Sequence, residues 1–317
     1  MSVRDLLVLG SAGAVPTKTR NHNGYLLRWD GHGLLFDPGE GTQRQMTFAG
    51  VTATAVTWLC LTHFHGDHCL GVPGMIQRIA RDGVEHVVNA AFPASGEEYW
   101  RRLRHATSFY DTSDIAEHPL AGDTVRLDTG PAPFTLTARR LDHSIEAYGY
   151  RLAEPDGVTM LPGELAARGV RGPLVRRLRD EGRVTAPDGR TVALEEVSVR
   201  RPGQKVAFVM DTGLCPAAYE LARDADMLVI ESTFLDADAR LAEERKHLTA
   251  GRAGEIAAVA GVRHLVLTHF SERYRAEDER LFAEQAAARF DGEITIAHDL
   301  DRIPMPRRRS ASVARTG

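Results

Sequence analysis

Long apolar segments are missing from this chain of 317 residues. No stretch approaches the ~18 uninterrupted apolar residues of a membrane span, so we expect no membrane partner. The N-terminal MSVRDLLVLGSAG has too short an apolar run for a secretory signal and predicts a first strand instead. Cysteine is also scarce, and Cys60, Cys69 and Cys215 are an odd number without framework spacing. That pattern favours a reducing cytoplasm over an oxidising compartment.

Lysine is nearly absent, and arginine supplies almost all of the positive charge. A net charge of −4 by itself argues against a nucleic-acid partner. The distribution of the charge argues the other way, because the segment from Arg168 to Arg183 holds six arginines and two acidic residues. Such a local block can bind phosphates even on an acidic protein, although a solvated basic face is the alternative.

Short apolar runs alternate with helical patterns along most of the chain. The runs that predict strands are Leu6–Leu9, Tyr25–Trp29, Gly33–Phe36, Val56–Leu61, Phe134–Leu141, Tyr148–Leu152, Lys205–Met210, Met227–Ile230, His264–Leu267 and Ile294–Ile296. The patterns that predict helices are Leu70–Arg81, Gly96–Ala106, Pro216–Asp224, Thr249–Ala260 and Ala276–Phe290. Strands interleaved with helices indicate an α/β fold with covered sheet faces.

Residues 153–199 break this alternation. The stretch is rich in glycine, proline and arginine and has weak periodicity. We therefore expect an inserted flexible arm at 153–199, with residues 1–152 and 200–306 forming one main domain around it. Residues 307–317 have the composition of a disordered tail.

The densest cluster of chemically active side chains follows the run Val56–Leu61. His63, His65, Asp67 and His68 stand within six consecutive positions at the C-terminal end of that predicted strand. Imidazole and carboxylate together suit zinc and related metals such as manganese or iron. Four ligands on one tight loop exceed what a single catalytic metal takes from one segment, so we expect two metals. A loop of merely solvated histidines is the alternative.

Three further candidate ligands stand at the ends of later predicted strands: His143, Asp211 and His269. Each alone is a weak signal, since a single polar residue after a strand is usually a cap or turn residue. Together they complete two coordination spheres. The expected first sphere is His63, His65 and His143, the second is Asp67, His68 and His269, and Asp211 bridges them.

This ordered set resembles the metallo-β-lactamase superfamily, and within it the chain closely resembles the ribonuclease Z family of tRNA 3′-processing endonucleases. The segments that carry the second resemblance are Gly10–Asn21, Leu35–Gln43, Leu61–Gly74, Glu231–Phe234, His247–Ala250 and His269–Tyr274. The likeness extends over nearly the whole chain. It implies an αββα sandwich with a dinuclear metal site on one edge and a protruding arm inserted into it.

The resemblance also implies the reaction. A family member removes the 3′ trailer from precursor tRNA, leaving a 3′-hydroxyl on the tRNA and a 5′-phosphate on the trailer, with two zinc ions per subunit. His247 is implied to assist departure of the ribose oxygen or to stabilise the transition state. Glu231 would orient an imidazole, at His247 or His269, and Asp67 would accept a proton from the attacking water.

Substrate binding is expected at two places. Lys18 and Arg20 are expected to line the cleft that admits the 3′ strand, and Arg273 is expected to bind substrate. The arm is implied to grip the tRNA body. The arm residues expected to take part are Gly172, Pro173, Arg176 and Arg177. The family resemblance implies a homodimer in which one subunit's arm serves the other's active site. A metallo-hydrolase of the same fold acting on a small substrate, or a non-catalytic RNA-binding relative, are the alternatives.

Overall fold

The computed structural model describes residues 3–309. Their contacts divide the chain into two compact units, one formed by Met1–Ala153 with Lys205–Pro306 and one formed by Glu154–Gln204 with the residues that follow Pro306. Most of the tail that the sequence predicts to be disordered, 307–317, lies outside the described residues. Each unit is described by itself below.

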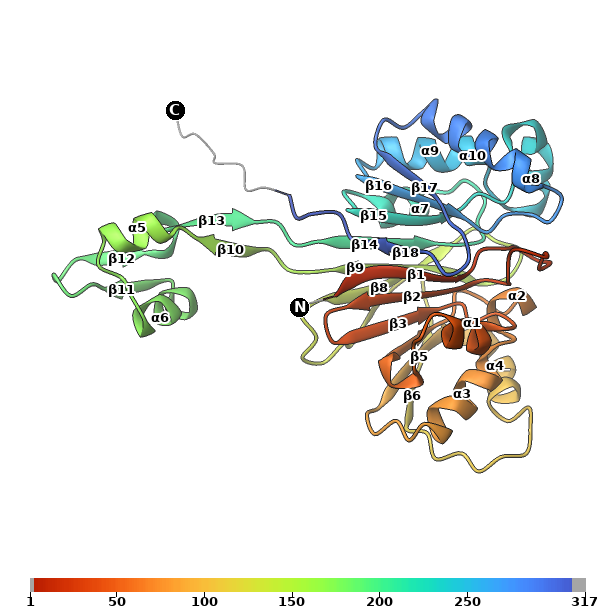
Figure 1. Ribbon diagram of the computed structural model, residues 1–317, viewed down its shortest axis with the longest axis horizontal. Helices are drawn as coiled ribbons and strands as arrows, with labels where there is room; N and C mark the ends of the chain where they lie inside the picture. The colour runs from red at the N-terminus through yellow and green to blue at the C-terminus, as the bar shows by residue number, and fades with distance from the viewer. Residues whose placement is uncertain (1–2, 310–317) are drawn as a thin grey trace. The chain divides into compact units, whose positions relative to one another are not determined.

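The first unit contains two mixed sheets (Figure 1). The first sheet has the strand order β18-β1-β2-β3-β4-β5-β6, with β1 Arg4–Gly10, β2 Gly24–Trp29, β3 His32–Phe36, β4 Trp58–Cys60, β5 Val88–Pro93, β6 Ile115–Leu120 and β18 Arg302–Pro304. The second has the order β17-β16-β15-β14-β9-β8-β7, with β7 Thr124–Leu127, β8 Thr135–Leu141, β9 Ala147–Ala153, β14 Lys205–Val209, β15 Met227–Glu231, β16 His264–Thr268 and β17 Glu293–Ile296.

Helices cover the outer face of each sheet (Figure 1). The first sheet is covered by α1 Thr42–Phe48, α3 Val72–Arg81 and α4 Glu97–Arg104, and the short α2 Gly66–Cys69 follows β4. The second sheet is covered by α7 Pro216–Ala222, α9 Ala250–Val259 and α10 Glu279–Ala287, and α8 Ala239–Arg245 lies between β15 and α9 in sequence. Within residues 3–309, no helix is long and apolar enough to cross a bilayer.

Alternation along the strands explains the layers. On β1, Leu6 and Val8 pack in the cluster between the two sheets, whereas Leu7 packs against α1 and α3. On β15, Val229 faces the other sheet and Ile230 faces α9. A strand buried on both faces must be apolar at successive positions, which is why these segments are continuous hydrophobic runs. The expected αββα sandwich is confirmed.

The sequence predicted the strands and helices around the core closely, but it missed several others. Strands β5, β6, β7 and β18 and helices α1 and α8 were not predicted. Strand β4 is shorter than the run that predicted it, because its pairing with β3 and β5 ends at Cys60. The polar loop that carries the candidate ligands begins directly after this point.

The second unit also has regular elements: β10 Gly157–Met160, α5 Pro162–Ala167, α6 Pro173–Glu181, β11 Arg183–Thr185, β12 Thr191–Ala193 and β13 Ser198–Arg201. Strand β10 pairs with β13, and β11 with β12. A small apolar cluster that includes Leu165, Leu178 and Val197 holds it together. The chain leaves the first unit after Ala153 and re-enters it at Lys205, and these two residues are register partners on β9 and β14.

Close backbone approach fixes the loop before α3. A Cβ placed on Gly71 would lie 2.1 Å from the carbonyl oxygen of Gly39 and 2.7 Å from that of Pro38. The Gly71 N–H donates to that Pro38 oxygen at 2.8 Å. The start of α3 therefore lies directly on the loop that follows β3.

Replacing Gly71 with alanine is expected to destabilise the first unit by about 1–3 kcal/mol, because backbone atoms must move to admit the methyl group. The measurement is the urea unfolding midpoint by circular dichroism. Gly31→Ala is the matched control, since nothing lies within 4 Å of a Cβ at that position. Equal midpoints for the two variants would show that the Gly71 contact is not rigid.

Candidate metal centre

The candidate ligands gather at one edge of the sandwich because of strand direction. His63, His65, Asp67 and His68 lie on the loop and short helix after β4. The other three follow β8, β14 and β16, which run in the same direction within the second sheet. The carboxyl ends of parallel strands meet at one edge of a sheet, the place where α/β folds position functional groups.

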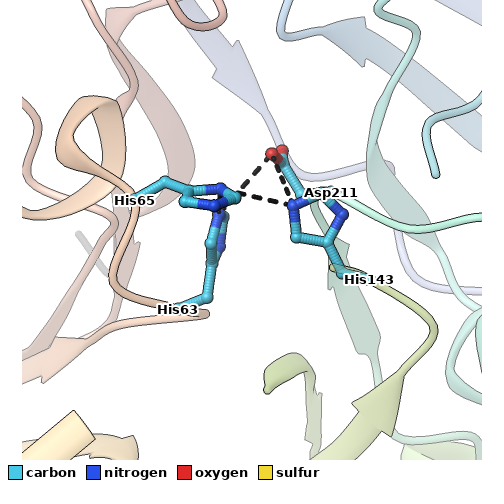
Figure 2. A group of neighbouring side chains, drawn as sticks. All are labelled: His63, His65, His143 and Asp211. Carbon is cyan, nitrogen blue, oxygen red and sulfur yellow. Dashed lines mark hydrogen bonds and ion pairs between the residues drawn. The ribbon is translucent and has the colours of Figure 1, made fainter. Parts of the chain in front are cut away.

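The first group consists of His63, His65, His143 and Asp211 (Figure 2). One ligand atom from each lies within 4.8 Å of the others. His63 Nε2 is 2.9 Å from His65 Nδ1, and His143 Nε2 is 3.3 Å from the same atom. Asp211 Oδ2 lies 3.6 Å from His63 Nε2 and 3.7 Å from His143 Nε2. The four side chains therefore surround one point.

The second group consists of Asp67, His68 and His269. The Nε2 atoms of the two histidines are 3.2 Å apart, and Asp67 Oδ2 is 3.2 Å from His68 Nε2 and 3.5 Å from His269 Nε2. Asp211 Oδ1 lies 3.1 Å from His269 Nε2 and 3.4 Å from His68 Nε2. One oxygen of Asp211 thus faces each group.

A third set that could hold a metal is Asp211, His247 and His269. It overlaps the second group, and His247 was not expected to be a ligand. The Nε2 atom of His247 is 4.0 Å from Asp211 Oδ2, while its Nδ1 atom contacts the carboxylate of Glu231. His247 therefore borders both groups and keeps one nitrogen facing the cavity.

Asp37 organises the ligands of the loop after β4, a role that the sequence did not reveal. Its Oδ1 accepts the Thr62 N–H at 2.7 Å, and its Oδ2 accepts the Thr62 hydroxyl at 2.8 Å. The same Oδ2 lies 2.9 Å from His68 Nδ1. Because the Thr62 hydroxyl donates to Asp37, its oxygen accepts from His63 Nδ1 at 2.9 Å. Both imidazoles therefore carry the proton on Nδ1 and direct an Nε2 lone pair into the site.

The same arrangement recurs on the second sheet. The Thr233 hydroxyl donates to Glu231 Oε2 at 2.5 Å, so its oxygen accepts from His269 Nδ1 at 2.8 Å. His143 Nδ1 donates to the backbone carbonyl of Lys246 at 3.2 Å. Again the Nε2 lone pairs face inward. Outer partners of this kind set the tautomer and orientation of metal-binding imidazoles.

The clustered imidazole and carboxylate atoms have the chemistry of a metal-binding site. His68 and His269 direct their Nε2 atoms at one another, 3.2 Å apart, and at Asp211. Asp211 Oδ1 is buried and has no hydrogen-bond partner with regular geometry. Burial lowers the pKa of His63 well below its ordinary value, and the charge of the nearby His68 adds to this effect. Against the effect of burial, the surrounding carboxylates Asp67, Asp211 and Asp37 raise the pKa of His68 well above its ordinary value. A cluster of inward-facing imidazole and carboxylate donors fits divalent metal ions.

Two candidate ligands and the residue Asp37 are held in unusual backbone conformations. Asp37 has φ 43°, Asp211 has φ 23° and His269 has φ 61°. Side chains rarely adopt this left-handed region, and such residues persist only where surrounding contacts hold them. For Asp37 and His269 the hydrogen bonds described above supply those contacts.

Glu231 and His247 form a buried acid–imidazole pair beside the metal groups. Both Glu231 oxygens lie near His247 Nδ1, at 3.1 and 3.0 Å, and the Thr212 N–H donates to Oε1 at 2.7 Å. Burial by itself would lower the pKa of His247, but the charges of Glu231 and Asp211 raise it to about 9. Glu231 therefore orients His247 directly and reaches His269 only through Thr233.

A cavity of about 730 Å³ opens over the candidate ligands. Its walls include His65, Asp67, His143, Asp211, His247 and His269, together with Phe234, Arg245, Lys246 and Arg273. Arg273 is among the residues that line this cavity, and its Nη1 atom also donates to Asp238 at 3.1 Å.

The structure gives Arg20 a different role from the expected one. Its Nη1 donates to Ser11 Oγ and to the Ala297 carbonyl, each at 2.6 Å, and its Nη2 pairs with Glu279 at 2.6 Å. The guanidinium also stacks on the Phe270 ring at 4.5 Å. Arg20 is buried and anchors the loop between β1 and β2, so its charge does not face the metal groups.

Lys18 is not among the residues that line the cavity over the ligands. Lys18 lines a separate cavity of about 430 Å³ that Arg20 also borders. Gly172 precedes α6 with φ 54°, and Pro173 is the first residue of that helix. Arg176 and Arg177 are exposed on α6, where they pair with Asp180 and Glu181. These residues belong to the second unit.

Comparison with known proteins agrees with this geometry. A family model described as "Metallo-beta-lactamase superfamily" matches residues 17–214, and one described as "Beta-lactamase superfamily domain" matches residues 182–270. The fold and the first match place the chain in the metallo-β-lactamase superfamily. Human tRNase Z, short form, has the same fold, with a TM-score of 0.67 and 24% identity over 95% of this chain and 99% of that one.

Close sequence relatives define the family. The chain is 63% identical over 310 residues to ribonuclease Z of Thermobifida fusca, covering 98% of this chain and 97% of the relative. It is 60% identical over 309 residues to ribonuclease Z of Nocardia farcinica, covering 98% of this chain and 100% of the relative. The chain therefore belongs to the ribonuclease Z family, and the family resemblance noted in the sequence is confirmed.

Asp37→Ala is expected to lower metal affinity about 10-fold to 100-fold, because His68 and Thr62 lose the acceptor that orients them. Metal retention during dialysis against a chelator, followed by atomic emission, measures the loss. Asp5→Ala is the control, since it removes a carboxylate that pairs with Arg28 outside the site. Retention equal to that of the control would mean that Asp37 does not position the ligands.

Proposed function

We propose that this chain is a zinc-dependent endoribonuclease that removes the 3′ trailer from precursor tRNA. The products are a tRNA with a 3′-hydroxyl and a trailer with a 5′-phosphate. One observation carries the proposal. Members of both candidate ligand groups line the same cavity as His247, and His247 contacts Glu231. Membership of the ribonuclease Z family over nearly the full chain supports the choice of substrate.

The residues proposed to hold the metals divide into two sets. His63, His65 and His143 would hold one zinc ion, and a second set of Asp67, His68 and His269 would hold another. Asp211 would bridge them, since each of its oxygens faces one set. Zinc bound there would lower the pKa of a water molecule and screen the negative charge of the scissile phosphate. Manganese or iron could occupy the same donors.

The protein's own groups then manage the protons. Asp67 lines the cavity. It would accept a proton from the attacking water. As the oxygen of that water bonds to phosphorus, the bond between phosphorus and the ribose 3′-oxygen breaks. His247, held through Nδ1 by Glu231, has Nε2 facing the cavity and donates a proton to the departing oxygen. The tRNA thus leaves with a 3′-hydroxyl.

Substrate contacts are proposed on both units. The exposed arginines of α6, together with Gly172 and Pro173, would contact the tRNA backbone by shape and charge. Arg273 lies on the cavity rim, where it can face the strand that enters the site. The family resemblance supports a cytoplasmic homodimer in which each arm serves the partner's site, and sedimentation of the purified protein tests the dimer.

The direct test is incubation of the purified protein with a trailer-bearing precursor tRNA. We expect a single cut at the 3′ side of the acceptor stem, with the product ends mapped by sequencing and by sensitivity to phosphatase. Added chelator should abolish the cut, and zinc should restore it. Intact precursor in the presence of zinc would refute the proposal.

His247→Ala is expected to lower kcat on precursor tRNA about 100-fold to 10,000-fold, the range of general acid–base catalysis. Zinc content, measured on the same sample, should stay unchanged. His105→Ala, on the loop after α4, is the control and should keep full activity. Loss of zinc together with activity would instead make His247 a ligand.

Removal of the second unit separates binding from chemistry. Residues 154–204 can be replaced by Asn-Gly, because Ala153 and Lys205 are paired neighbours that a two-residue hairpin turn can join. We expect kcat/KM on precursor tRNA to fall at least about 100-fold through lost phosphate contacts. Hydrolysis of bis(p-nitrophenyl) phosphate should persist. Equal loss of both activities would contradict this division.

A further inference from the structure

Lys246, the residue before His247, ends helix α8 in a left-handed conformation with φ 55° and ψ 54°. This conformation is rare for a side chain that has a Cβ and favours glycine. It turns the chain sharply, so the carbonyl of Lys246 faces the loop after β8 while His247 faces the cavity. One residue therefore sets the direction of two functional groups.

Two separate contacts tie Lys246 to the β8 loop. Its carbonyl accepts from His143 Nδ1 at 3.2 Å. Its ammonium donates to Asp142 Oδ1 at 2.6 Å and to the His143 carbonyl at 3.4 Å. Asp142 is the direct neighbour of His143, so the ammonium restrains the backbone that carries this imidazole.

Asp142 extends the connection to the loop after β14. Its backbone carbonyl accepts the Gly213 N–H at 2.7 Å, and its own N–H donates to the Thr212 hydroxyl at 3.3 Å. A Cβ on Gly213 would lie 3.0 Å from Asp142 Oδ2, so the carboxylate rests on that glycine. Thr212 and Gly213 directly follow Asp211. The three loops that carry His143, Asp211 and His247 therefore meet at the Lys246–Asp142 pair.

We propose that Lys246 is a positioning residue, whose ammonium fixes His143 and the Asp211 loop relative to His247. The proposal rests on the proposed function, because it concerns residues of the same site. The side chains of Lys246 and Asp142 are about half exposed, at 44% and 51%. An ion pair this exposed adds little to the free energy of unfolding. We therefore expect it to restrain the positions of the loops that it joins.

A direct contact between Lys246 and a substrate phosphate is the competing explanation, since Lys246 also lines the cavity. The two explanations differ in their dependence on Asp142. If the ammonium acts through Asp142, then Lys246→Met and Asp142→Asn should cause the same defect. If it binds phosphate, Asp142→Asn should free the cation and leave activity intact.

The test compares Lys246→Met, Lys246→Arg, Asp142→Asn and the Met/Asn double variant on trailer-bearing precursor tRNA. We expect kcat to fall between about 3-fold and 30-fold in Lys246→Met and in Asp142→Asn, with KM within twofold of the wild type, because small misplacements of reacting groups are costly. The double variant should be no slower than either single variant. Lys246→Arg should restore most of the rate. Arg240→Met removes an exposed ion pair from the same helix and is the control.

A second measurement does not depend on RNA. Proteins loaded with zinc alone are mixed with a chromogenic chelator, and the rate of zinc release is followed. Lys246→Met and Asp142→Asn should both release zinc faster than the control, since His143 is less well held. Unchanged kcat and unchanged release in Lys246→Met would overturn the proposal. So would a raised KM with wild-type behaviour of Asp142→Asn. If the two variants release zinc faster than the control but even the wild-type protein does not cut precursor tRNA, the positioning role is supported. The proposed function alone is then refuted.

Discussion

The candidate metal centre depends on which nitrogen of each histidine carries the proton. Thr62 and Thr233 each give their hydroxyl proton to a buried carboxylate, Asp37 or Glu231, and can then only accept from a histidine. Asp37 and the Lys246 carbonyl accept from two more. With the Nδ1 atoms of these four histidines directed outward, their Nε2 atoms converge at one edge of the sandwich, where His65 presents its Nδ1. The residues that hold the ligands thereby also fix which nitrogen is free to bind a cation.

The sequence predicted the layers because burial dictates composition. Strands such as β1 and β15 are covered on both faces, so they had to be continuous apolar runs, and their ends marked the ligand positions. Strands β6 and β7 are largely exposed or half-buried, and the polar residues Glu117 and His118 in β6 and Thr124 and Arg126 in β7 leave no continuous apolar run. Helix α8 was missed because it buries little beyond Ala242, so its polar sequence lacks the period of a core helix.

Two features of the site depended on distant contacts that no local pattern reports. Asp37 follows a strand like any turn residue, and its three hydrogen bonds arise only when β4 pairs with β3 and brings Thr62 alongside. Arg20 was expected to line the cleft that admits the 3′ strand. Its guanidinium is instead enclosed by Ser11, Ala297 and Glu279, the last two brought in from the far end of the chain. Such partners are set by topology rather than by spacing.

The insertion point of the second unit also affects how the protein can fold. Ala153 and Lys205 are register partners at the ends of β9 and β14, so contact between these two residues aligns the two strands. The entropy cost of closing a loop rises only with the logarithm of its length, which makes the long intervening segment a modest burden. The sandwich can therefore assemble without waiting for the insert. Changes in the length of that segment should therefore leave the pairing of β9 with β14 intact.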